Sequence, residues 1–539
     1  MPDGKRSPGT DAEALAAALD VLERAAADRG LLASLDADAR MRLQKAAGEL
    51  ARPGPEQRRK LRRALARGER DARKARDGAL RRGTGIQALR LAPAYPTPAA
   101  MITGAVAASS AGADAGAGAE TDPPAGAGEF SAPRKCYVCK TAYTRLHRFY
   151  DQLCPACGDE NEARRTATVD LRGRVALVTG ARVKIGYQAA ILLLRAGCRV
   201  VSLTRFPRDA AARYAREPDF AAWRDRLDVF GIDLRHTPSV ETLCHHLDAW
   251  LPRLDFQIHN ACQTVRRPPG FYAHLVEAEE GPLDAVPAEA RGLVAAYERF
   301  RAAVRGAAAG VERPALLTQA RSEADLLRGM LRAGGLGGTG LIWPPQQDQG
   351  IFPRGVLDQD LQQVDLRTHN SWRLALHEVP TLELLEVLLV NATAPFVMAS
   401  RLQGLMLRHR AAPPGTATSG DAAKHVVMVS AMEGQFYRDH KTDRHPHTNM
   451  AKAALNMLVR TSAAGLARDG IHLNAVDTGW VTDEDPAHLA ARKAEEHAFS
   501  PPLDIVDGAA RVVAPIVEGF RTGRHAHGLF FKDYEPAPW

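Results

Sequence analysis

The chain has 539 residues, of which 45% are apolar and 25% are charged. This composition is typical of globular proteins, and the length allows about two to four domains. The net charge of +8 arises within residues 1–90, which contain 21 Lys and Arg against 13 Asp and Glu, because the remainder has 50 of each. The sequence shows no apolar leader and no uninterrupted apolar run of about 18 residues, so we expect a cytoplasmic protein without a membrane span.

Residues 1–91 are predicted to form a basic helical region. Leucines recur at helical intervals in the first 50 residues, and a second helix is expected from Gln57 to Asp77. Twelve basic residues lie between Arg58 and Arg82. We favour a solvated helical face over a phosphate-binding surface, because no aromatic residues are interleaved to stack on bases. Binding of a nucleic acid or protein partner through this region is the alternative.

A small four-cysteine unit is predicted at 134–165, after a stretch at 92–133 whose Ala, Gly, Pro, Ser and Thr predict a flexible linker. The spacing is Cys136-x2-Cys139-x14-Cys154-x2-Cys157. Two such pairs can surround one Zn²⁺ with four thiolates, and a closed shell predicts a structural metal. A redox role is disfavoured, because neither pair opens a helix in a βαβ pattern. Contact with a protein or nucleic acid is a further role that this unit could serve.

Residues 168–539 alternate between strands and helices. Apolar strands are predicted at 173–180, 198–205, 227–234, 254–261, 425–431 and 471–477, with helical segments between them. This alternation predicts an α/β fold with a doubly wound parallel sheet of the Rossmann type. A large insert at about 263–379 is far longer than an ordinary connection, and we interpret it as a subdomain or lid. Helical patterns within it cover 287–309 and 315–333.

The first strand of this region ends in TGARVKIG and opens a helix. Such a turn brings backbone amides and a helix N-terminus to a pyrophosphate. The segment resembles the TGxxxGxG motif of the short-chain dehydrogenase/reductase family, with Lys184 in place of the middle glycine. The resemblance implies nucleotide contacts from Thr179, Gly180, Arg182, Lys184, Ile185 and Gly186. The ammonium group of Lys184 could pair with the phosphates.

Later segments match the same family in the expected order. Asp233-Leu234 resembles the adenine-contacting pair after the third strand, and Asn260-Ala261 resembles part of the NNAG motif after the fourth. NAVDTGWVTD, at 474–483, resembles the NAVxPG segment beside the nicotinamide. The second strand ends at Arg205 rather than at an acidic residue, which favours the 2′-phosphate of NADP over the free ribose hydroxyl of NAD.

The proton relay of the family is only partly retained. Lys452, in HPHTNMAKAAL, matches the relay lysine, which also holds the cofactor ribose, and Asn391, in VNATAPF, matches the asparagine that completes the relay. The tyrosine position is occupied by Thr448, whose hydroxyl is a poor general acid. The serine position falls on Ala431, and Ser430 lies one residue earlier.

The loop before Lys452 offers replacements for the missing tyrosine. Tyr437 begins a literal YxxxK, although its register differs from that of the family motif. His440, His445 and His447 follow, and histidine titrates near neutral pH. A loop that merely packs against the insert is an equally open interpretation.

We therefore expect an NADP(H)-dependent oxidoreductase of the short-chain dehydrogenase/reductase type, acting on an unidentified small-molecule carbonyl or alcohol. A structural Zn²⁺ and a homo-oligomer, which the family resemblance implies, belong to this hypothesis. The alternative is a non-catalytic NADP-binding scaffold or sensor with a zinc-dependent partner-binding module. Retention of Lys452 and Asn391 favours the enzyme, whereas the loss of the tyrosine and serine favours the alternative.

Overall fold

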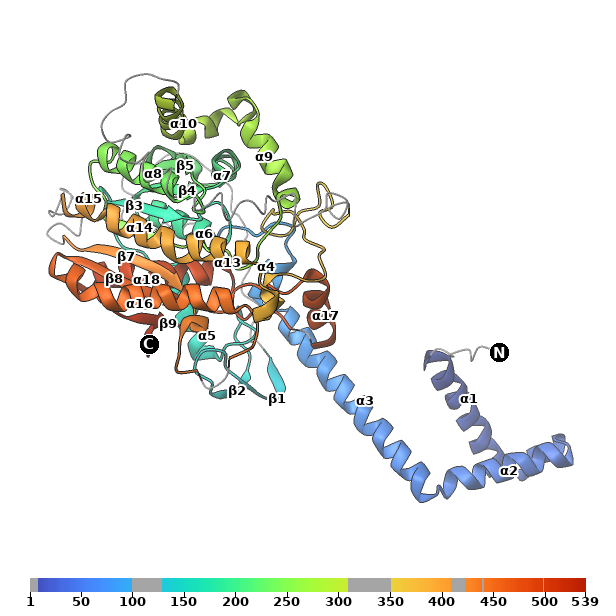
Figure 1. Ribbon diagram of the computed structural model, residues 1–539. Coiled ribbons are helices and arrows are strands. Elements are labelled where there is room, and N and C mark those ends of the chain that lie inside the picture. The colour runs from blue at the N-terminus through green and yellow to red at the C-terminus, as the bar shows by residue number, and fades with distance from the viewer. Residues whose placement is uncertain (1–7, 99–127, 309–349, 409–421, 439–440, 498) are drawn as a thin grey trace, which may run out of the picture. The chain divides into compact units, whose positions relative to one another are not determined.

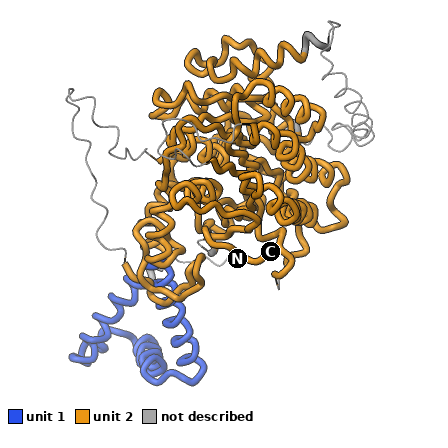
Figure 2. Tube along the Cα trace, turned by 90° about the vertical axis from the view of Figure 1, so that its left-hand side faces the viewer, with its two compact units in different colours: residues 1–77 blue, residues 78–539 orange. Residues whose placement is uncertain are grey.

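The computed structural model describes residues 8–98, 128–308, 350–408, 422–438, 441–497 and 499–539 (Figure 1). These residues form two compact units, 1–77 and 78–539, coloured blue and orange in Figure 2.

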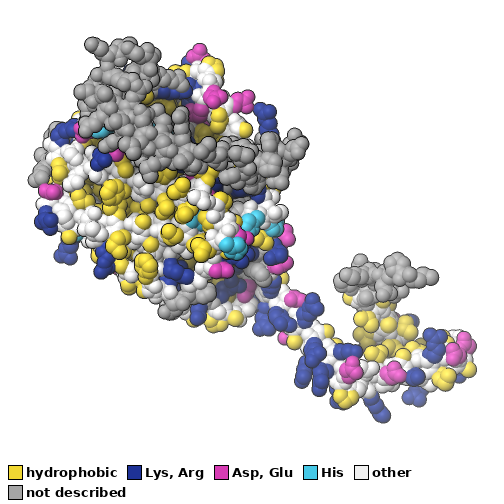
Figure 3. Space-filling view, in the orientation of Figure 1, with side chains coloured by type: hydrophobic (Ala, Val, Ile, Leu, Met, Phe, Trp, Pro, Cys, Tyr) yellow, Lys and Arg dark blue, Asp and Glu magenta, His cyan; other side chains and the backbone are white. Residues whose placement is uncertain are grey.

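The first unit holds α1 (Pro8–Ala27), α2 (Ala37–Ala51) and most of α3 (Pro55–Arg82), as the periodicity predicted. Basic side chains of α3 are exposed (Figure 3), and Lys60 pairs with Glu56 one turn away at 2.9 Å. Binding of a partner through this helix, the alternative to a solvated face, stays a hypothesis.

The second unit is built on an eight-stranded sheet with the order β10-β9-β8-β7-β6-β3-β4-β5. All neighbours are parallel except β9 and β10. The strands are β3 (Val175–Thr179), β4 (Arg199–Thr204), β5 (Leu227–Gly231), β6 (Phe256–His259), β7 (Lys424–Ser430), β8 (Ile471–Asp477), β9 (Phe530–Lys532) and β10 (Glu535–Ala537). The strand order reverses direction at β3 and β6, so the predicted doubly wound Rossmann sheet is confirmed.

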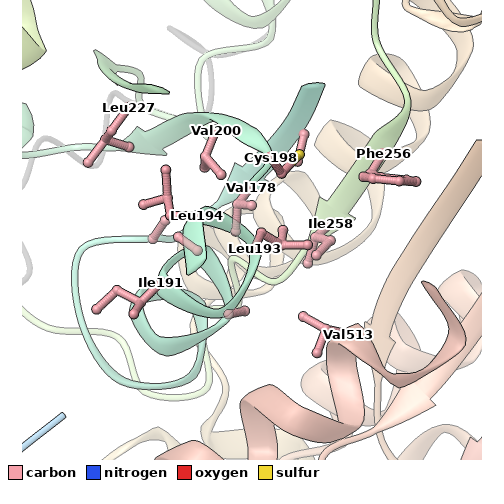
Figure 4. Packing of buried hydrophobic residues seen from close by; sticks show 14 of the residues in the cluster. Val178, Ile191, Leu193, Leu194, Cys198, Val200, Leu227, Phe256, Ile258 and Val513 are labelled. Carbon is pink, nitrogen blue, oxygen red and sulfur yellow. The ribbon is translucent and has the colours of Figure 1, made fainter. Parts of the chain in front are cut away.

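Helices cover both faces of the sheet, which explains why its strands are apolar on both sides. One face carries α6 (Lys184–Arg195), α7 (Pro207–Tyr214) and α18 (Ile505–Thr522). The other carries α8 (Thr237–Trp250), α14 (Ala394–Arg401) and α16 (Pro446–Arg468). Figure 4 shows the first face from close by, with Val178 of β3 and Leu193 of α6 in a cluster that also includes Val513 of α18.

One helical run would be long and apolar enough to cross a membrane. It spans Thr381–Arg408, with a mean hydropathy of 1.6. The run consists of α13 (Thr381–Leu388), the π-helical turn η9 (Leu389–Thr393), α14 and α15 (Gln403–Arg408). Here it packs on α8 and α16, and 39% of its apolar window is buried.

The described part of the insert contains α9 (Ala273–Glu280) and α10 (Ala288–Ala308), and α10 packs on β5 and α7. The helix predicted at 315–333 lies outside the described residues. After the insert, α13 leads back to the sheet. The segment between β8 and α18 carries α17 (Ala487–His497).

The four-cysteine unit consists of β1 (Glu129–Lys135), β2 (Ala142–Arg145) and α5 (Pro155–Arg165). Strand β1 begins within the range predicted as linker, because Phe130 is buried in the apolar cluster of this unit. Helix α4 (Gly85–Leu91) and residues 92–98 also belong to the second unit, where Tyr95 donates to Asp504. Most of the predicted linker, 99–127, lies outside the described residues.

Candidate nucleotide and catalytic site

A cavity of about 1300 Å³ lies at the carboxyl ends of the parallel strands. This is where doubly wound sheets bind their ligands. Its wall includes these residues that the sequence singled out: Gly180, Arg182, Lys184, Ile185, Arg205, Asp233, Leu234, Asn260, Ala261, Ser430 and Lys452. Thr179 and Gly186 do not line the cavity but contact residues that do: Thr179 Oγ1 accepts from the Ala261 amide at 3.0 Å, and Gly186 packs against Asn260. The strand ends therefore bring the predicted nucleotide residues to one cavity.

The turn after β3 is packed so tightly that glycine is required at two positions. Gly180 has φ +68°, and a Cβ there would lie 2.9 Å from the Ala261 Cα. A Cβ on Gly186 would lie 2.3 Å from Asn260 Nδ2. That amide donates to the carbonyl oxygens of Thr179 and Gly180 at 3.2 and 3.3 Å. The turn thus leaves the helix N-terminus of α6 open to a phosphate, which fits a dinucleotide.

Lys184 adopts the left-handed conformation, with φ +56°, at the position where the family motif has glycine. The backbone of the motif is therefore kept although the residue differs. Its Nζ lies 3.8 Å from an Asp360 carboxylate oxygen of the insert. Burial alone would lower the pKa of Lys184, but the carboxylates of Glu484 and Asp360 outweigh it and raise this pKa above its ordinary value. The ammonium stays charged beside the turn.

The ends of β4 and β5 present opposite charges to the cavity. Arg205 is exposed, and its guanidinium lies 4.4 Å from the ring centre of Tyr272. Asp233 accepts three side-chain hydrogen bonds from Arg235, at 2.7, 3.0 and 3.2 Å. Burial would raise the pKa of Asp233, but these bonds hold it below its ordinary value. Arg235 also reaches Glu386 of α13 at 3.0 Å, a link that no sequence motif indicated.

Lys452 lines the cavity, whereas Asn391 lies behind its wall. Lys452 is buried in its wall and donates through Nζ to the Val429 carbonyl oxygen at 2.7 Å. Asn391 occupies the π-helical turn η9 and is bonded to the backbone of Gln263, accepting from its amide at 2.7 Å. Asn391 thereby fixes the first residues of the insert, and Gln263 rather than Asn391 contributes to the wall.

The other predicted catalytic residues have different surroundings. Ser430 donates to Asn456 Oδ1 of α16 at 2.6 Å. Thr448 is buried and donates to the His445 carbonyl oxygen at 2.8 Å. Tyr437 is 44% exposed, and its hydroxyl lies 3.8 Å from Met432 Sδ, outside the wall that the described residues form. Only Ser430 of these three lines the cavity.

His445 is the residue of the His-rich loop that reaches the cavity. It precedes α16 with φ +41°, and its Nδ1 lies 3.0 Å from Thr448 Oγ1. Because the hydroxyl proton of Thr448 goes to a carbonyl, this contact favours the tautomer with the proton on Nδ1 and leaves Nε2 as an acceptor. Burial lowers the pKa of His445 to about 4, so the ring is neutral at neutral pH. His447 instead lies near Glu383, at 3.4 Å, and His440 is outside the described residues.

Two family profiles match the chain. A family described as short chain dehydrogenase matches residues 174–276, and one described as Enoyl-(Acyl carrier protein) reductase matches 376–501, so the matches flank the insert. An uncharacterised protein of Acanthamoeba polyphaga mimivirus is 30% identical over 394 residues, which cover 71% of each chain. The protein belongs to the short-chain dehydrogenase/reductase family.

Other similar proteins match more weakly. A Drosophila melanogaster protein described as WW domain-containing oxidoreductase is 33% identical over 93 residues, 17% of this chain and 23% of its own. A Pseudomonas aeruginosa RhlG structure with NADP aligns with 17% identity and a TM-score of 0.37, covering 67% of this chain and 95% of that one. A putative short chain dehydrogenase of Escherichia coli complexed with NADPH aligns with 14% identity and a TM-score of 0.38, covering 68% and 98%.

This short-chain dehydrogenase/reductase has aromatic wall residues that the family motifs do not indicate. Trp372, in the insert, stacks on His445, with the ring centroids 3.9 Å apart. Trp480 lies within 474–483, the segment that resembles NAVxPG, and its ring packs on Phe499, with the ring centroids 4.8 Å apart. Tyr137 comes from the four-cysteine unit. The insert and the four-cysteine unit thus both contribute to the cavity of the Rossmann domain.

The four predicted metal ligands are brought together. The sulfur atoms of Cys136, Cys139, Cys154 and Cys157 all lie within 4.8 Å of one another, and all four are free cysteines. The Cys154 amide donates to Cys136 Sγ at 3.3 Å. Burial raises the pKa of Cys154 and Cys157, whereas hydrogen bonds with Thr141 lower the pKa of Cys139 to about 6. A four-thiolate set of this kind fits Zn²⁺.

Proposed function

We propose that the protein is an NADP(H)-dependent oxidoreductase that interconverts a carbonyl and an alcohol on a small molecule. The observation that carries the proposal is the shared cavity, because one wall holds both the open phosphate turn and the relay residue Lys452. When bound, NADP(H) would supply hydride chemistry. Gly180, Gly186 and Lys184 would hold its pyrophosphate, and Lys452 would hold the ribose.

The preference for NADP over NAD rests on Arg205. Its guanidinium is exposed at the end of β4 and lies over Tyr272, and the strand end carries no acidic side chain that would bind the ribose hydroxyl of NAD. Arginine is suited to phosphate because its planar group donates two parallel hydrogen bonds.

We infer that His445 replaces the missing tyrosine in the proton relay. During alcohol oxidation its neutral Nε2 would accept the hydroxyl proton of the substrate, and in the reverse direction it would return that proton to the carbonyl oxygen. Thr448 would hold the required tautomer through Nδ1. Stacking on Trp372 restricts the ring, which helps to preorganise the base.

We also propose that the four cysteines bind one structural Zn²⁺. A closed shell of four thiolates leaves no position for a substrate. The metal would supply folding energy that a unit of this size lacks.

A titration of purified protein with NADPH and with NADH, followed by cofactor fluorescence, tests the nucleotide proposal. We expect tight binding of NADPH and weaker binding of NADH. A panel of carbonyls and alcohols then tests turnover, with Lys452→Ala as the background. Binding without turnover above that background would contradict the enzyme and support the scaffold alternative. Binding of neither nucleotide would indicate that Lys184 closes the phosphate turn.

A further inference from the structure

The first cysteine pair reaches the wall of the nucleotide cavity. Tyr137 follows Cys136 directly, and Lys140 follows Cys139, and both line the cavity together with Gly479 and Trp480. These two segments are separated by more than 300 residues in the sequence. The four-cysteine unit is therefore part of the site and not a tethered neighbour of it.

Tyr137 is fixed by the unit to which it belongs. Its amide donates to the Gln152 carbonyl oxygen at 2.9 Å, and Lys140 donates to the Tyr137 carbonyl oxygen. The Lys140 ammonium also lies 4.8 Å from the centre of the Tyr137 ring. On its other side, the Cys136 amide donates to the Thr141 carbonyl oxygen at 2.9 Å. The position of the ring thus follows the position of the two cysteine pairs.

The Tyr137 hydroxyl in turn holds the loop after β8. It accepts a hydrogen bond from the Trp480 amide at 2.9 Å. Gly479 has φ +77°, and a Cβ on it would lie 3.3 Å from that hydroxyl and 2.5 Å from Leu503 Cδ1. At the start of the loop, Asp477 accepts from the Gly479 amide at 2.7 Å. The loop is therefore clamped between Asp477 and Tyr137, with no room for a side chain at Gly479.

The contact between the unit and the Rossmann domain is extensive and buried. Leu503 belongs to the apolar cluster of the four-cysteine unit. Arg165 of α5 pairs with Asp504 and Asp507 at 2.7 and 2.8 Å, and all three side chains are at least nine-tenths buried. Helix α5 packs on α18, one of the helices that cover the sheet (Figure 1). A unit anchored in this way can hold Tyr137 rigidly against the loop.

We propose that Tyr137 is a positioning residue for the nicotinamide half of the nucleotide site, and that the metal-binding pair couples metal loading to NADP(H) binding. The proposal rests on the proposed function, and on the resemblance of 474–483 to the segment beside the nicotinamide. Loss of the Tyr137 hydroxyl frees the Trp480 amide, and the loop that flanks the nicotinamide then loosens. The adenine half of the site, around Arg205 and Asp233, is formed by other strand ends and is unaffected.

The test compares two ligands on Tyr137→Phe. NADPH has both halves of the cofactor, whereas adenosine 2′,5′-bisphosphate has the adenine and the 2′-phosphate but no nicotinamide. We expect the variant to bind NADPH about fivefold more weakly, as the loss of one hydrogen bond implies, and to bind the bisphosphate as the wild type does. Tyr143→Phe is the matched control, because Tyr143 is buried in the same unit and its hydroxyl lies 3.4 Å from the Asp151 carbonyl oxygen, outside the cavity wall. It should change neither affinity.

Other outcomes separate this inference from the proposed function. Unchanged NADPH binding in Tyr137→Phe would overturn the positioning role, and so would an equal loss for both ligands. Failure of the wild type to bind either ligand would instead overturn the proposed function, and this inference with it. Gly479→Ala is a second variant that displaces Tyr137 from the other side, and it should reproduce the selective loss of NADPH affinity. Removal of the metal by a chelator should also weaken NADPH binding selectively. Unchanged NADPH affinity in the metal-free protein would overturn the proposed coupling of metal loading to NADP(H) binding.

Discussion

The imidazole of His445 lies flat on the indole of Trp372, with the ring centroids 3.9 Å apart and the planes inclined by 7°. Trp372 belongs to the insert, whereas His445 precedes the helix that carries Lys452. The insert therefore fixes the side chain that we place in the proton relay. Through this contact the insert would influence the relay that we propose for His445.

Replacing His445 by glutamine should abolish most turnover. Glutamine keeps a polar side chain of similar size but cannot exchange a proton, and general acid–base catalysis contributes roughly 10²- to 10⁴-fold. We expect kcat to fall within that range while the Kd for NADPH changes by less than about twofold, because His445 is not among the residues that we propose to hold the nucleotide. Steady-state kinetics and a fluorescence titration measure the two quantities. His488→Gln, in an exposed position of α17, is the control. Wild-type turnover in His445→Gln would assign the relay to another group.

The rate of alcohol oxidation should decline only at an unusually low pH. His445 must be neutral to accept a proton, and burial lowers its pKa to about 4, so the active form persists on the alkaline side of that value. We expect kcat/KM to stay level as the pH falls from 7 to about 5 and to decline only below that. A decline centred near pH 6.5, the ordinary value for histidine, would contradict a buried base. The profile should be recorded with NADP⁺ as oxidant, beside the residual rate of His445→Gln.

Arg205→Leu should lower the selectivity for NADPH over NADH. Hydrogen bonds to a charged group contribute about 1.5–3 kcal/mol, so NADPH affinity should fall at least about tenfold, whereas NADH affinity should stay within about twofold. Arg224→Leu is the matched control, because Arg224 is exposed and pairs with Asp225 away from the cavity. Parallel titrations at one ionic strength are needed, since phosphate contacts are screened by salt. An equal loss for both nucleotides would remove Arg205 from 2′-phosphate recognition.

Lys184→Gly separates backbone strain from charge at the phosphate turn. Glycine relieves the left-handed conformation at φ +56° but removes the ion pair with Asp360, so we expect the free energy of unfolding to change by less than about 1 kcal/mol. NADPH affinity should fall about tenfold, because an ammonium bond to phosphate is lost. Urea unfolding and fluorescence titration give the two values, with Lys184→Arg as the charge-retaining control. Tighter NADPH binding by the glycine variant would mean that Lys184 obstructs the turn.

Sequence patterns could predict the Rossmann sheet and its phosphate turn because both depend on local features. The strands are continuous apolar runs, and Gly180 and Gly186 are fixed by contacts within one βαβ unit. The short strands β9 and β10 were not predicted, because each has only three residues and little periodicity. The family order of motifs also placed Lys452 and Arg205 on the cavity wall.

The remaining parts of the site depend on contacts between distant segments. Tyr137 lies between two cysteines, and its sequence context indicates a metal unit and no contact with a cofactor. Trp372 lies in an insert without a family counterpart. The sequence could not distinguish His445 from the other histidines of its loop as a relay candidate, and its stacking on Trp372 is visible only in the structure. Tyr437, selected from a literal YxxxK, lies outside the described cavity wall because its loop turns the side chain toward solvent.

Removing one cysteine tests whether the unit binds a structural metal. We expect about one Zn²⁺ per wild-type chain by elemental analysis, and none in Cys154→Ser, because three thiolates cannot complete the tetrahedral shell. The midpoint of thermal unfolding should fall by at least about 5 °C, since the lost binding energy also stabilises the fold. The Rossmann domain should also lose stability, because Arg165 of the four-cysteine unit pairs with Asp507 of α18 and with Asp504, the residue that caps this helix. Cys262→Ser, an exposed cysteine elsewhere in the chain, should keep both the metal and the midpoint. Full stability of a metal-free wild type would show that the four cysteines need no ion.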